Sequence, residues 1–390
     1  MPINLASREK ISMFCNLPVA QVVGIHDVPN IYHVPILMLQ RNMHTLLFER
    51  LGLVDCTVGP SVGSVDAALR DILEKNLDAL KLSAGEPREI TFPEGLTVNA
   101  PQIQQWSEVA QTVDSSSAVV SIALVGKYTD LHDSYLSVIS SLRHACIGTK
   151  QRLRLVMIES SALEQRAAGH EKAWGKLHAA DGILVPGGIG VRGMEGKIAA
   201  IRHARTAKVP FLGICLGMQA AVIEYMRAVC GVHEANSEEF RPELPSDKQA
   251  IVFMPEGDRT QMGGTMRRGS RQSLLREGSL VRRLYGDAAS VWERHRHRYE
   301  VNPLLVEALE DAGLHFSGRD ETGERMECCE LGSGADHPYF VGVQYHPEYQ
   351  SRPFRPAPVF LGLMQAVQRT RQLQHEHQSD KSREQKFVSE

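Results

Sequence analysis

Near its middle the sequence reads Val209-Pro-Phe-Leu-Gly-Ile-Cys-Leu-Gly-Met-Gln219. The apolar residues 209–214 predict a short buried strand that stops abruptly at Cys215. Residues 216–226 carry apolar side chains at the spacing of one helix face, which predicts a helix. This stretch is therefore expected to pass from a strand directly into a helix, with a single cysteine at the turn.

Cys215 is flanked at this turn by Gly213 and Gly217. Glycine allows the backbone to bend sharply or to pass close to another group. The turn sets the sulfur at a helix N-terminus, where the helix dipole favours the thiolate over the thiol. Serine hydrolases use the same geometry in a Gly-x-Ser-x-Gly turn. Because a lone cysteine is more often a buried core residue, this motif alone leaves both interpretations open.

A second stretch, Phe340-Val-Gly-Val-Gln-Tyr-His-Pro-Glu-Tyr349, favours the nucleophile. It predicts another buried strand, which runs into His346 with Glu348 two residues later. A histidine beside the sulfur can take its proton, and a carboxylate can orient the imidazole. Residues two apart on an extended segment point in the same direction. Cys215, His346 and Glu348 are therefore a candidate catalytic triad.

Predicted strands and helices alternate in the part of the chain that surrounds these motifs. Strands are expected at 119–126, 153–158 and 182–186, and helices at 135–145 and 161–178. Because each strand is almost entirely apolar, we expect a doubly wound α/β fold with a parallel sheet covered on both faces. Sites in such sheets lie outside the carboxyl ends of the strands, where Gly187, Cys215 and His346 all fall.

The two motifs resemble those of the class I glutamine amidotransferases, whose fold is flavodoxin-like. Four further stretches are similar to the CTP synthase family, namely Val185-Pro-Gly-Gly-Ile-Gly-Val-Arg-Gly193, Ala235-Asn-Ser-Glu-Glu-Phe240, Gly263-Gly-Thr-Met-Arg267 and Glu293-Arg-His-Arg-His-Arg-Tyr-Glu-Val-Asn302. The resemblance covers most of residues 120–370. It implies that Cys215 attacks the side-chain amide of glutamine, with His346 as base and then acid and Glu348 orienting it.

The resemblance also implies which residues hold glutamine: Gly188, Leu216, Gly217, Met218, Gln219, Glu239 and Arg298. The glycine loop near Gly188 can present backbone N–H groups to an oxyanion, and the N–H of Leu216 would be a second donor. A tight turn is the structural alternative for this loop. Glu239 and Arg298 match family residues that hold the amino acid, although position alone would favour solvated side chains for both.

Residues 1–40 resemble the closing part of the ligase domain of the CTP synthase family, and strands are expected at 8–18 and 22–32. The resemblance places Lys10 in the pyrimidine nucleotide site, and Asp27 and Val28 beside the ATP adenine. A solvated lysine at a strand end is the alternative for Lys10. Because no glycine-rich phosphate loop with a lysine precedes these residues, the chain alone is not expected to bind and phosphorylate UTP.

The rest of the chain is predicted to link or extend these parts. Residues 65–80 have helical spacing, and residues 83–117 are rich in Gly, Pro, Ser and Gln, as interdomain linkers are. The charged, Gln-rich end predicts a disordered tail. The expected divisions are a ligase remnant at 1–40, an insertion and linker at 41–117, the amidotransferase domain at 118–370 and the tail at 371–390.

The bulk composition is that of an ordinary globular protein, with 390 residues, 43% hydrophobic and 23% charged. The formal net charge of -3 provides no basic field for nucleic acid. Because the 7 cysteines are scattered, neither a metal site nor a disulfide framework is expected. No apolar run approaches the length of about 18 residues that a membrane span needs, so no transmembrane helix is expected. The cysteine pattern favours a reducing compartment, and a cytoplasmic protein is therefore expected.

The predicted function is the glutaminase half-reaction of the CTP synthase family, with L-glutamine as substrate and no cofactor. The resemblance implies that the complete family enzyme aminates UTP with ATP and Mg²⁺, is activated by GTP and is a homotetramer. The sequence is compatible with a fragment, a truncated gene model or a paralogue that lacks the ligase half. A stand-alone hydrolase such as a γ-glutamyl hydrolase and a non-catalytic regulatory paralogue are the alternatives. The intact triad argues against the second of these.

Overall fold

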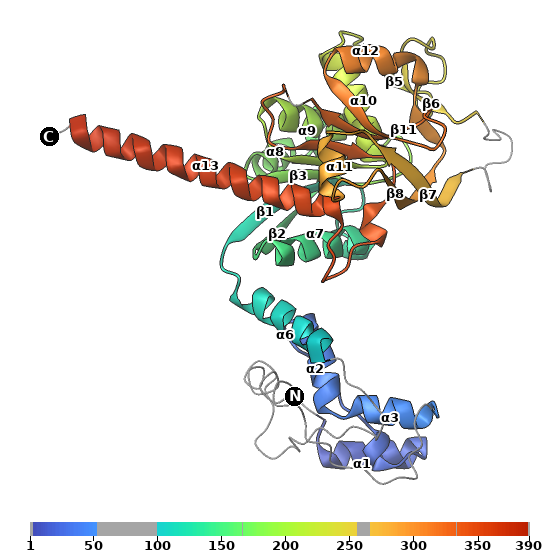
Figure 1. Ribbon diagram of the computed structural model, residues 1–390, viewed down its shortest axis with the longest axis vertical. Coiled ribbons are helices and arrows are strands. Elements are labelled where there is room, and N and C mark those ends of the chain that lie inside the picture. Colours follow the sequence, from blue (N-terminus) through green and yellow to red (C-terminus); the bar gives the residue numbers. More distant parts are fainter. Residues whose placement is uncertain (1–2, 53–99, 166, 256–265, 333, 389–390) are drawn as a thin grey trace. The chain divides into compact units, whose positions relative to one another are not determined.

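The computed structural model describes residues 3–52, 100–165, 167–255, 266–332 and 334–388 (Figure 1). The chain divides into two compact units, Met1–Ser116 and Ser117–Glu390. The helix expected at 65–80 and the linker residues 83–99 lie outside the described residues. Within the described residues, no helix is both long enough and apolar enough to cross a membrane.

The described part of the first unit is helical. Its helices are α1 (Leu5–Cys15), α2 (Val34–Gln40), α3 (Met43–Arg50) and α6 (Ala100–Ser115). The strands expected at 8–18 and 22–32 are wrong, since residues 8–15 belong to α1 and residues 22–32 contain no strand. The side chain of Asn4 caps the start of α1, and Asn16 ends it in a left-handed conformation. A run as short as this one does not distinguish a helix from a strand.

Helix α6 lies within the segment predicted to be an interdomain linker, residues 83–117. It is tied to the 30–33 segment of the same unit by its Asp114 carboxylate. This carboxylate accepts a hydrogen bond from Asn30 at 2.9 Å and lies 2.6 Å from the His33 ring. Trp106 of α6 also stacks against Tyr32, with ring centroids 6.4 Å apart. The Gln-rich composition of residues 100–115 gave no clear helix signal, but this packing holds the helix in place.

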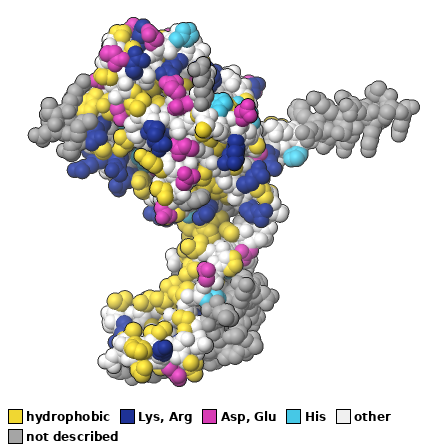
Figure 2. Space-filling model, turned by 180° about the vertical axis from the view of Figure 1, so that it is seen from behind, with side chains coloured by type: hydrophobic (Ala, Val, Ile, Leu, Met, Phe, Trp, Pro, Cys, Tyr) yellow, Lys and Arg dark blue, Asp and Glu magenta, His cyan; other side chains and the backbone are white. Residues whose placement is uncertain are grey.

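Apolar side chains are exposed on the first unit, as Figure 2 shows. Helix α1 has no buried residue. Its Leu5, Met13 and Phe14 side chains are 62%, 73% and 75% exposed. Large exposed apolar side chains gathered on one short helix are typical of a contact surface.

The second unit contains a nine-stranded sheet in the order β2-β1-β3-β4-β12-β11-β10-β7-β8. The strands are β1 (Val119–Gly126), β2 (Arg152–Glu159), β3 (Gly182–Val185), β4 (Phe211–Ile214), β7 (Arg267–Leu275), β8 (Ser290–His297), β10 (Leu314–Arg319), β11 (Met326–Leu331) and β12 (Phe340–Val343). Strands β2 to β12 in this order are parallel, and the pairs beyond β12 are antiparallel. The expected parallel sheet is therefore correct for one half and extended by an antiparallel half.

Helices cover both faces of this sheet, as the sequence predicted. One buried cluster joins it to α8 (His170–His178), α9 (Met194–Thr206), α10 (Leu216–Ala228) and α12 (Val306–Asp311). The other joins it to α7 (Leu136–Gly148), α11 (Leu280–Leu284) and α13 (Pro358–Val388). Helix α10 lies centrally, and all its residues from Leu216 to Met226 are buried rather than one face alone.

Two predicted segments differ from the structure of this unit. The helix expected at 161–178 begins only at His170, because Gly169 precedes it in a left-handed conformation with φ 75°. Residues 371–388 of the tail expected to be disordered are instead part of α13, which continues to Val388. Few apolar residues occur in this segment, but Gln, Glu, Arg and Lys favour helix and no proline interrupts it after Pro358.

A small second sheet adds the remaining wall of the candidate site. It contains β5 (Asn236–Ser237), β6 (Gln249–Phe253) and β9 (Tyr299–Val301) in the order β5-β6-β9. Strand β9 follows β8 after a single residue, Arg298. The segment after β5 carries Glu239, so this sheet sets both charged residues of the predicted glutamine site near the end of the large sheet.

Candidate active site

Cys215 lies between β4 and α10 at a turn that requires glycine on both sides. The cysteine itself has φ 51° and ψ -107°, a conformation that non-glycine residues adopt at a cost in energy. A methyl group on Gly213 would lie 2.7 Å from the carbonyl oxygen of Gly217. One on Gly217 would lie 2.0 Å from the carbonyl oxygen of Val185. The strained turn therefore directs the Cys215 side chain away from β4 and places it at the N-terminus of α10, a buried helix.

His346 reaches this turn from β12, which pairs with β4 in parallel register. The backbone N–H of Cys215 donates a hydrogen bond to the carbonyl oxygen of Val343 at 2.7 Å. His346 follows the end of the strand, and its Nδ1 lies 2.8 Å from Oε1 of Glu348. Gly187, in the loop that follows β3, packs against both side chains. A methyl group on it would lie 2.8 Å from His346 Cε1 and 3.4 Å from Cys215 Cβ. The three predicted catalytic residues are thus brought together.

The electrostatics of this group favour an imidazolium. The pKa of His346 is raised to about 10. Burial by itself would lower this pKa, but the hydrogen bonds to Cys215 and Glu348 and the charges of both outweigh it. A histidine held in this way can carry the proton that the sulfur gives up when it acts as a nucleophile.

The glycine loop of residues 186–193 borders the sulfur from the β3 side. Gly190 and Gly193 have φ 82° and 71°, so the tight-turn interpretation holds at these two positions. Lys127, which follows β1, fixes the loop: its Nζ donates to the carbonyl oxygens of Ile189 at 2.8 Å and Gly190 at 2.6 Å. Sequence reasoning missed this lysine, whose only signal is its place directly after a buried strand.

Lys197 is a second lysine that the sequence did not single out. It lies on α9 and is 1% exposed. A methyl group on Gly188 would lie 3.5 Å from its Nζ, so the amine is beneath the predicted oxyanion loop. Its pKa is lowered to about 7, first by burial and then by the charge of Lys127, while Cys215 and Glu159 oppose the shift. A buried amine with a lowered pKa is a typical feature of a functional cleft.

Some residues predicted to hold glutamine have side chains at the border of the site, whereas one has its side chain in the core. Gln219 and the charged pair Glu239 and Arg298 border the site. Burial raises the pKa of the Glu239 carboxyl, opposed by a hydrogen bond from the Gly190 backbone and by the charges of Lys127 and Arg298. The Met218 side chain instead packs into the core against Gly342, so only its backbone is placed to contact a ligand.

Gln219 links this wall to the sulfur. Its Nε2 donates to the carbonyl oxygen of Tyr299 at 2.8 Å and to Oε1 of Gln344 at 3.1 Å. Gln344 in turn donates from Nε2 to the Cys215 sulfur at 3.6 Å. Both amide hydrogens of Gln219 are used in these bonds, so its remaining polar atom, Oε1, is an acceptor suited to an α-ammonium group.

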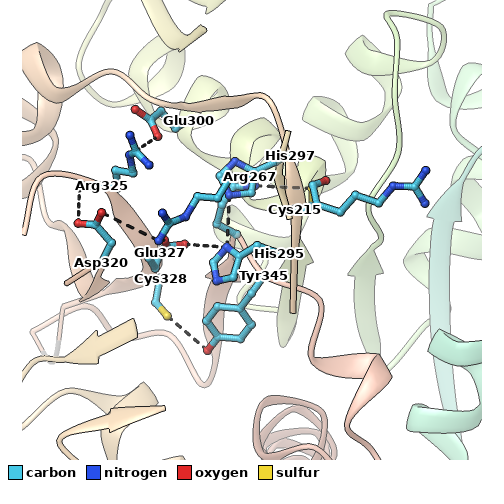
Figure 3. A network of polar contacts seen from close by, with 12 residues as sticks. Cys215, Arg267, His295, His297, Glu300, Asp320, Arg325, Glu327, Cys328 and Tyr345 are labelled. Atoms are coloured by element: carbon cyan, nitrogen blue, oxygen red, sulfur yellow. Dashed lines mark hydrogen bonds and ion pairs between the residues drawn. The ribbon is translucent and has the colours of Figure 1, made fainter. Parts of the chain in front are cut away.

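A buried network of polar residues lies behind the site (Figure 3). Arg267 is 3.3 Å from a Glu327 oxygen, and His295 Nδ1 is 3.4 Å from the other oxygen and 3.3 Å from His297 Nε2. Burial, together with the charge of Arg267, lowers the pKa of His295 to about 2 and of His297 to about 3. Burial also raises the pKa of Glu327 to about 8, against the effect of Arg267.

Three side chains of this network are of the kinds that bind metal ions and lie close together. The ligand atoms of His295, His297 and Glu327 lie within 4.8 Å of one another. However, Arg267 already supplies the positive charge beside Glu327, and a divalent cation would be repelled by its guanidinium. We therefore interpret the group as a buried polar network that joins β7, β8 and β11.

The residues predicted to bind nucleotides belong to the first unit. Lys10 is exposed on α1, on a helix rather than at a strand end. Asp27 is exposed and Val28 is half-buried, and both lie in an irregular segment before the short helix Ile31–His33. Their assignment to nucleotide binding stays a prediction.

Known proteins similar to this chain include the families that the sequence motifs resemble. A family model described as glutamine amidotransferase class-I matches residues 130–366, and one described as CTP synthase N-terminus matches residues 1–53. CTP synthase of Eremothecium gossypii is 46% identical over 92% of this chain and 58% of its own length. Human CTP synthase 1 is 43% identical over 94% of this chain and 55% of its own. The chain thus spans little more than half the length of these relatives.

A solved structure is also similar to the second unit. It is the glutaminase domain of Trypanosoma brucei CTPS with bound acivicin, which is 40% identical with a TM-score of 0.59. The match covers 64% of this chain and 94% of that domain.

Proposed function

The chain belongs to the class I glutamine amidotransferase family and, within it, to the CTP synthases; we propose that it hydrolyses L-glutamine with Cys215 as the nucleophile. The observation that carries this proposal is the Cys215–His346–Glu348 arrangement at the carboxyl end of the sheet. Its sulfur lies at a strained turn, its histidine has a raised pKa, and its carboxylate holds the histidine at 2.8 Å.

The first half of the reaction forms a thioester. The Cys215 thiolate attacks the side-chain amide carbon of glutamine, and the amide oxygen takes up the negative charge. Backbone N–H groups near Gly188 and of Leu216 stabilise this oxyanion, each at a typical value of about 2.7–4 kcal/mol. The imidazolium of His346 gives its proton to the leaving nitrogen, so the C–N bond breaks and ammonia departs.

The second half regenerates the enzyme. Neutral His346 takes a proton from a water molecule that attacks the thioester carbon. The C–S bond breaks, sulfur leaves as a thiolate, and glutamate is released while His346 is again an imidazolium. Glu348 keeps the ring oriented and stabilises its charge in both halves.

Recognition of glutamine is assigned to the two charged residues at the site wall. Glu239 pairs with the α-ammonium group and Arg298 with the α-carboxylate. Gln219 adds a neutral acceptor through Oε1. Supporting this, the pKa of Glu239 responds to both Arg298 and Lys127, so the opposite charges share one region.

The wider reaction follows from the relatives. We propose that the ammonia serves the amination of UTP to CTP with ATP and Mg²⁺, when the remaining length of the family enzyme is present. Residues 1–40 then contribute Lys10, Asp27 and Val28 to nucleotide binding, and GTP activates the glutaminase. A homotetramer in the cytoplasm completes this proposal. The exposed apolar side chains of α1 support an assembly, because a partner surface would cover them.

A comparison of substrates tests the glutaminase proposal. The full chain is incubated with L-glutamine and, in parallel, with a γ-glutamyl dipeptide, and glutamate release is measured. We expect turnover of glutamine and little turnover of the dipeptide, because Cys215 is enclosed by Gly187, Gln344 and His346. Preferred turnover of the dipeptide would instead favour a γ-glutamyl hydrolase on the same fold.

A further inference from the structure

Gln344 is a buried side chain that the reaction described above does not use. It follows β12 directly and is 0% exposed. Its backbone N–H donates to the carbonyl oxygen of Glu327 at 2.8 Å, which fixes the residue to the neighbouring strand β11. Its side-chain nitrogen, Nε2, lies 3.6 Å from the Cys215 sulfur, within the range of an N–H···S hydrogen bond.

The orientation of the Gln344 amide is determined by its neighbours. The carbonyl oxygen of Tyr299 can only accept, so Gln219 must present its nitrogen there, at 2.8 Å. The second hydrogen of the same nitrogen points to Gln344 and needs an acceptor, which is Oε1 at 3.1 Å. The amide nitrogen of Gln344 must therefore face the sulfur. Turning this amide over would set two donors against each other and a carbonyl oxygen against the thiolate.

The start of this chain of hydrogen bonds is anchored as well. The Tyr299 carbonyl also accepts from Nδ1 of His297 at 3.0 Å, so the proton of that ring is on Nδ1. His297 Nε2 then accepts from His295 Nδ1 at 3.3 Å, inside the buried network of Figure 3. The donor and the acceptor of each hydrogen bond are thus determined along the whole series, from His295 in the antiparallel half of the sheet to the Cys215 sulfur.

We propose that Gln344 is a further catalytic residue, whose amide N–H stabilises the negative charge of the Cys215 sulfur. The inference rests on the proposed function of Cys215 as the nucleophile. A hydrogen bond to an ionised acceptor is about twice as strong as a neutral one. Because the donor is uncharged, it stabilises the thiolate without competing with the imidazolium of His346 for the position of the counter-ion.

This contact assists both halves of the reaction. Before attack, it holds the sulfur as the anion that acts as the nucleophile. During thioester hydrolysis, the C–S bond breaks and both electrons of that bond go to sulfur. The same N–H then stabilises the leaving thiolate. In this scheme Gln219 is a positioning residue, since it acts on the sulfur only through the orientation of Gln344.

The test measures how fast Cys215 reacts with iodoacetamide between pH 5 and 9, followed by the mass of the peptide that contains it. The full chain is compared with Gln344→Met, Gln344→Glu and Gln219→Met. The control is Gln272→Met, which removes an amide that bonds Ser290 on the antiparallel side of the sheet. Gln344→Glu keeps the shape of the side chain, so it serves if Gln344→Met does not fold.

We expect Gln344→Met to move the pH profile of alkylation to higher pH by about one unit, which is about a tenfold slower reaction on its acidic limb. Gln344→Glu should move it further, because its carboxylate also repels the thiolate. Gln219→Met should shift it in the same direction by less, and Gln272→Met should match the unmodified chain. Profiles of folded Gln344 variants that superimpose on the unmodified one would overturn the inference. An unmodified Cys215 that reacts no faster than an exposed thiol would instead contradict its role as nucleophile.

Discussion

Val343 and Ile214 lie opposite each other in parallel register at the ends of β12 and β4. The backbone N–H of Cys215, the next residue after Ile214, donates a hydrogen bond to the carbonyl oxygen of Val343 at 2.7 Å. This bond fixes the position of the nucleophile relative to β12, the strand that leads to His346. Because both strands end at the same edge of the sheet, the backbone alone brings the sulfur and the imidazole together.

Replacing Glu348 tests the orientation of the base. In Glu348→Gln the carboxylate that accepts from His346 Nδ1 at 2.8 Å becomes a neutral amide, which neither stabilises the imidazolium nor fixes its tautomer. We expect kcat for glutamine to fall by about 10²–10⁴-fold, with little change in KM. The control is Glu195→Gln, an exposed carboxylate that pairs with Arg227. Equal kcat values for the Glu348 variant and the unmodified chain would exclude the triad.

Changes to the charged wall should act on binding rather than on chemistry. Arg298→Met removes the proposed partner of the α-carboxylate, and a hydrogen bond to a charged group contributes about 1.5–3 kcal/mol. We expect KM to rise about 10–100-fold while kcat changes little. Arg276→Met, which removes a cation paired with Glu310, is the matched control. A lower kcat at unchanged KM would assign Arg298 to another role.

Alanine substitutions of Gly217 and, as a control, of Gly175 test whether the turn at Cys215 requires glycine. A methyl group on Gly217 would lie 2.0 Å from the Val185 carbonyl oxygen, whereas Gly175 in α8 has open space around it. Gly217→Ala should lower the free energy of unfolding by about 1–3 kcal/mol or more. Gly175→Ala should raise it by about 0.5–1 kcal/mol, because alanine favours helix. Chemical denaturation of both variants measures these values, and equal stability of the two would be inconsistent with the close approach at Gly217.

Lys197 should make the stability of the protein depend on pH. Its pKa is about 7 in the folded chain and 10.5 ordinarily, so between these values the unfolded chain binds the extra proton. Stability is therefore reduced below pH 7 and recovers as pH rises toward 10.5, by at most about 1.4 kcal/mol per pH unit. Lys197→Met, which has no proton to lose, should lack this contribution.

Urea unfolding of both proteins from pH 7.5 to 9.5 measures this difference. Subtracting the variant from the unmodified chain cancels the other titrating groups. The difference should rise with pH, and parallel curves would contradict the burial of Lys197 as a neutral amine.

The sequence predicted the part of the site that local chemistry determines. Cys215 and His346 each end an apolar run, and runs of this kind predict parallel strands whose carboxyl ends meet. The same reasoning could not find Lys127, Lys197 or the bond from Gln344 to the sulfur. Their importance comes from burial and from distances between segments remote in the chain, which no spacing in the sequence encodes.

The misassigned elements have physical reasons too. Helix α1 is short and has no buried residue, so no apolar helix face marks it in the sequence. Helix α6 was hidden by composition and is held by contacts of Asp114 and Trp106 with the 30–33 segment. The antiparallel strands β7 and β8 carry charged and histidine side chains, and in β8 these alternate between a buried and an exposed face rather than forming an apolar run.

Glutamate release from L-glutamine by the full chain and by Cys215→Ala is the most direct measurement of the role assigned to Cys215. We predict that the unmodified chain releases glutamate with the formation of one ammonia per glutamate, and that Cys215→Ala releases none while it still binds glutamine. Hydrolysis that persists in Cys215→Ala, or a folded, unmodified chain that does not hydrolyse glutamine, would contradict the account.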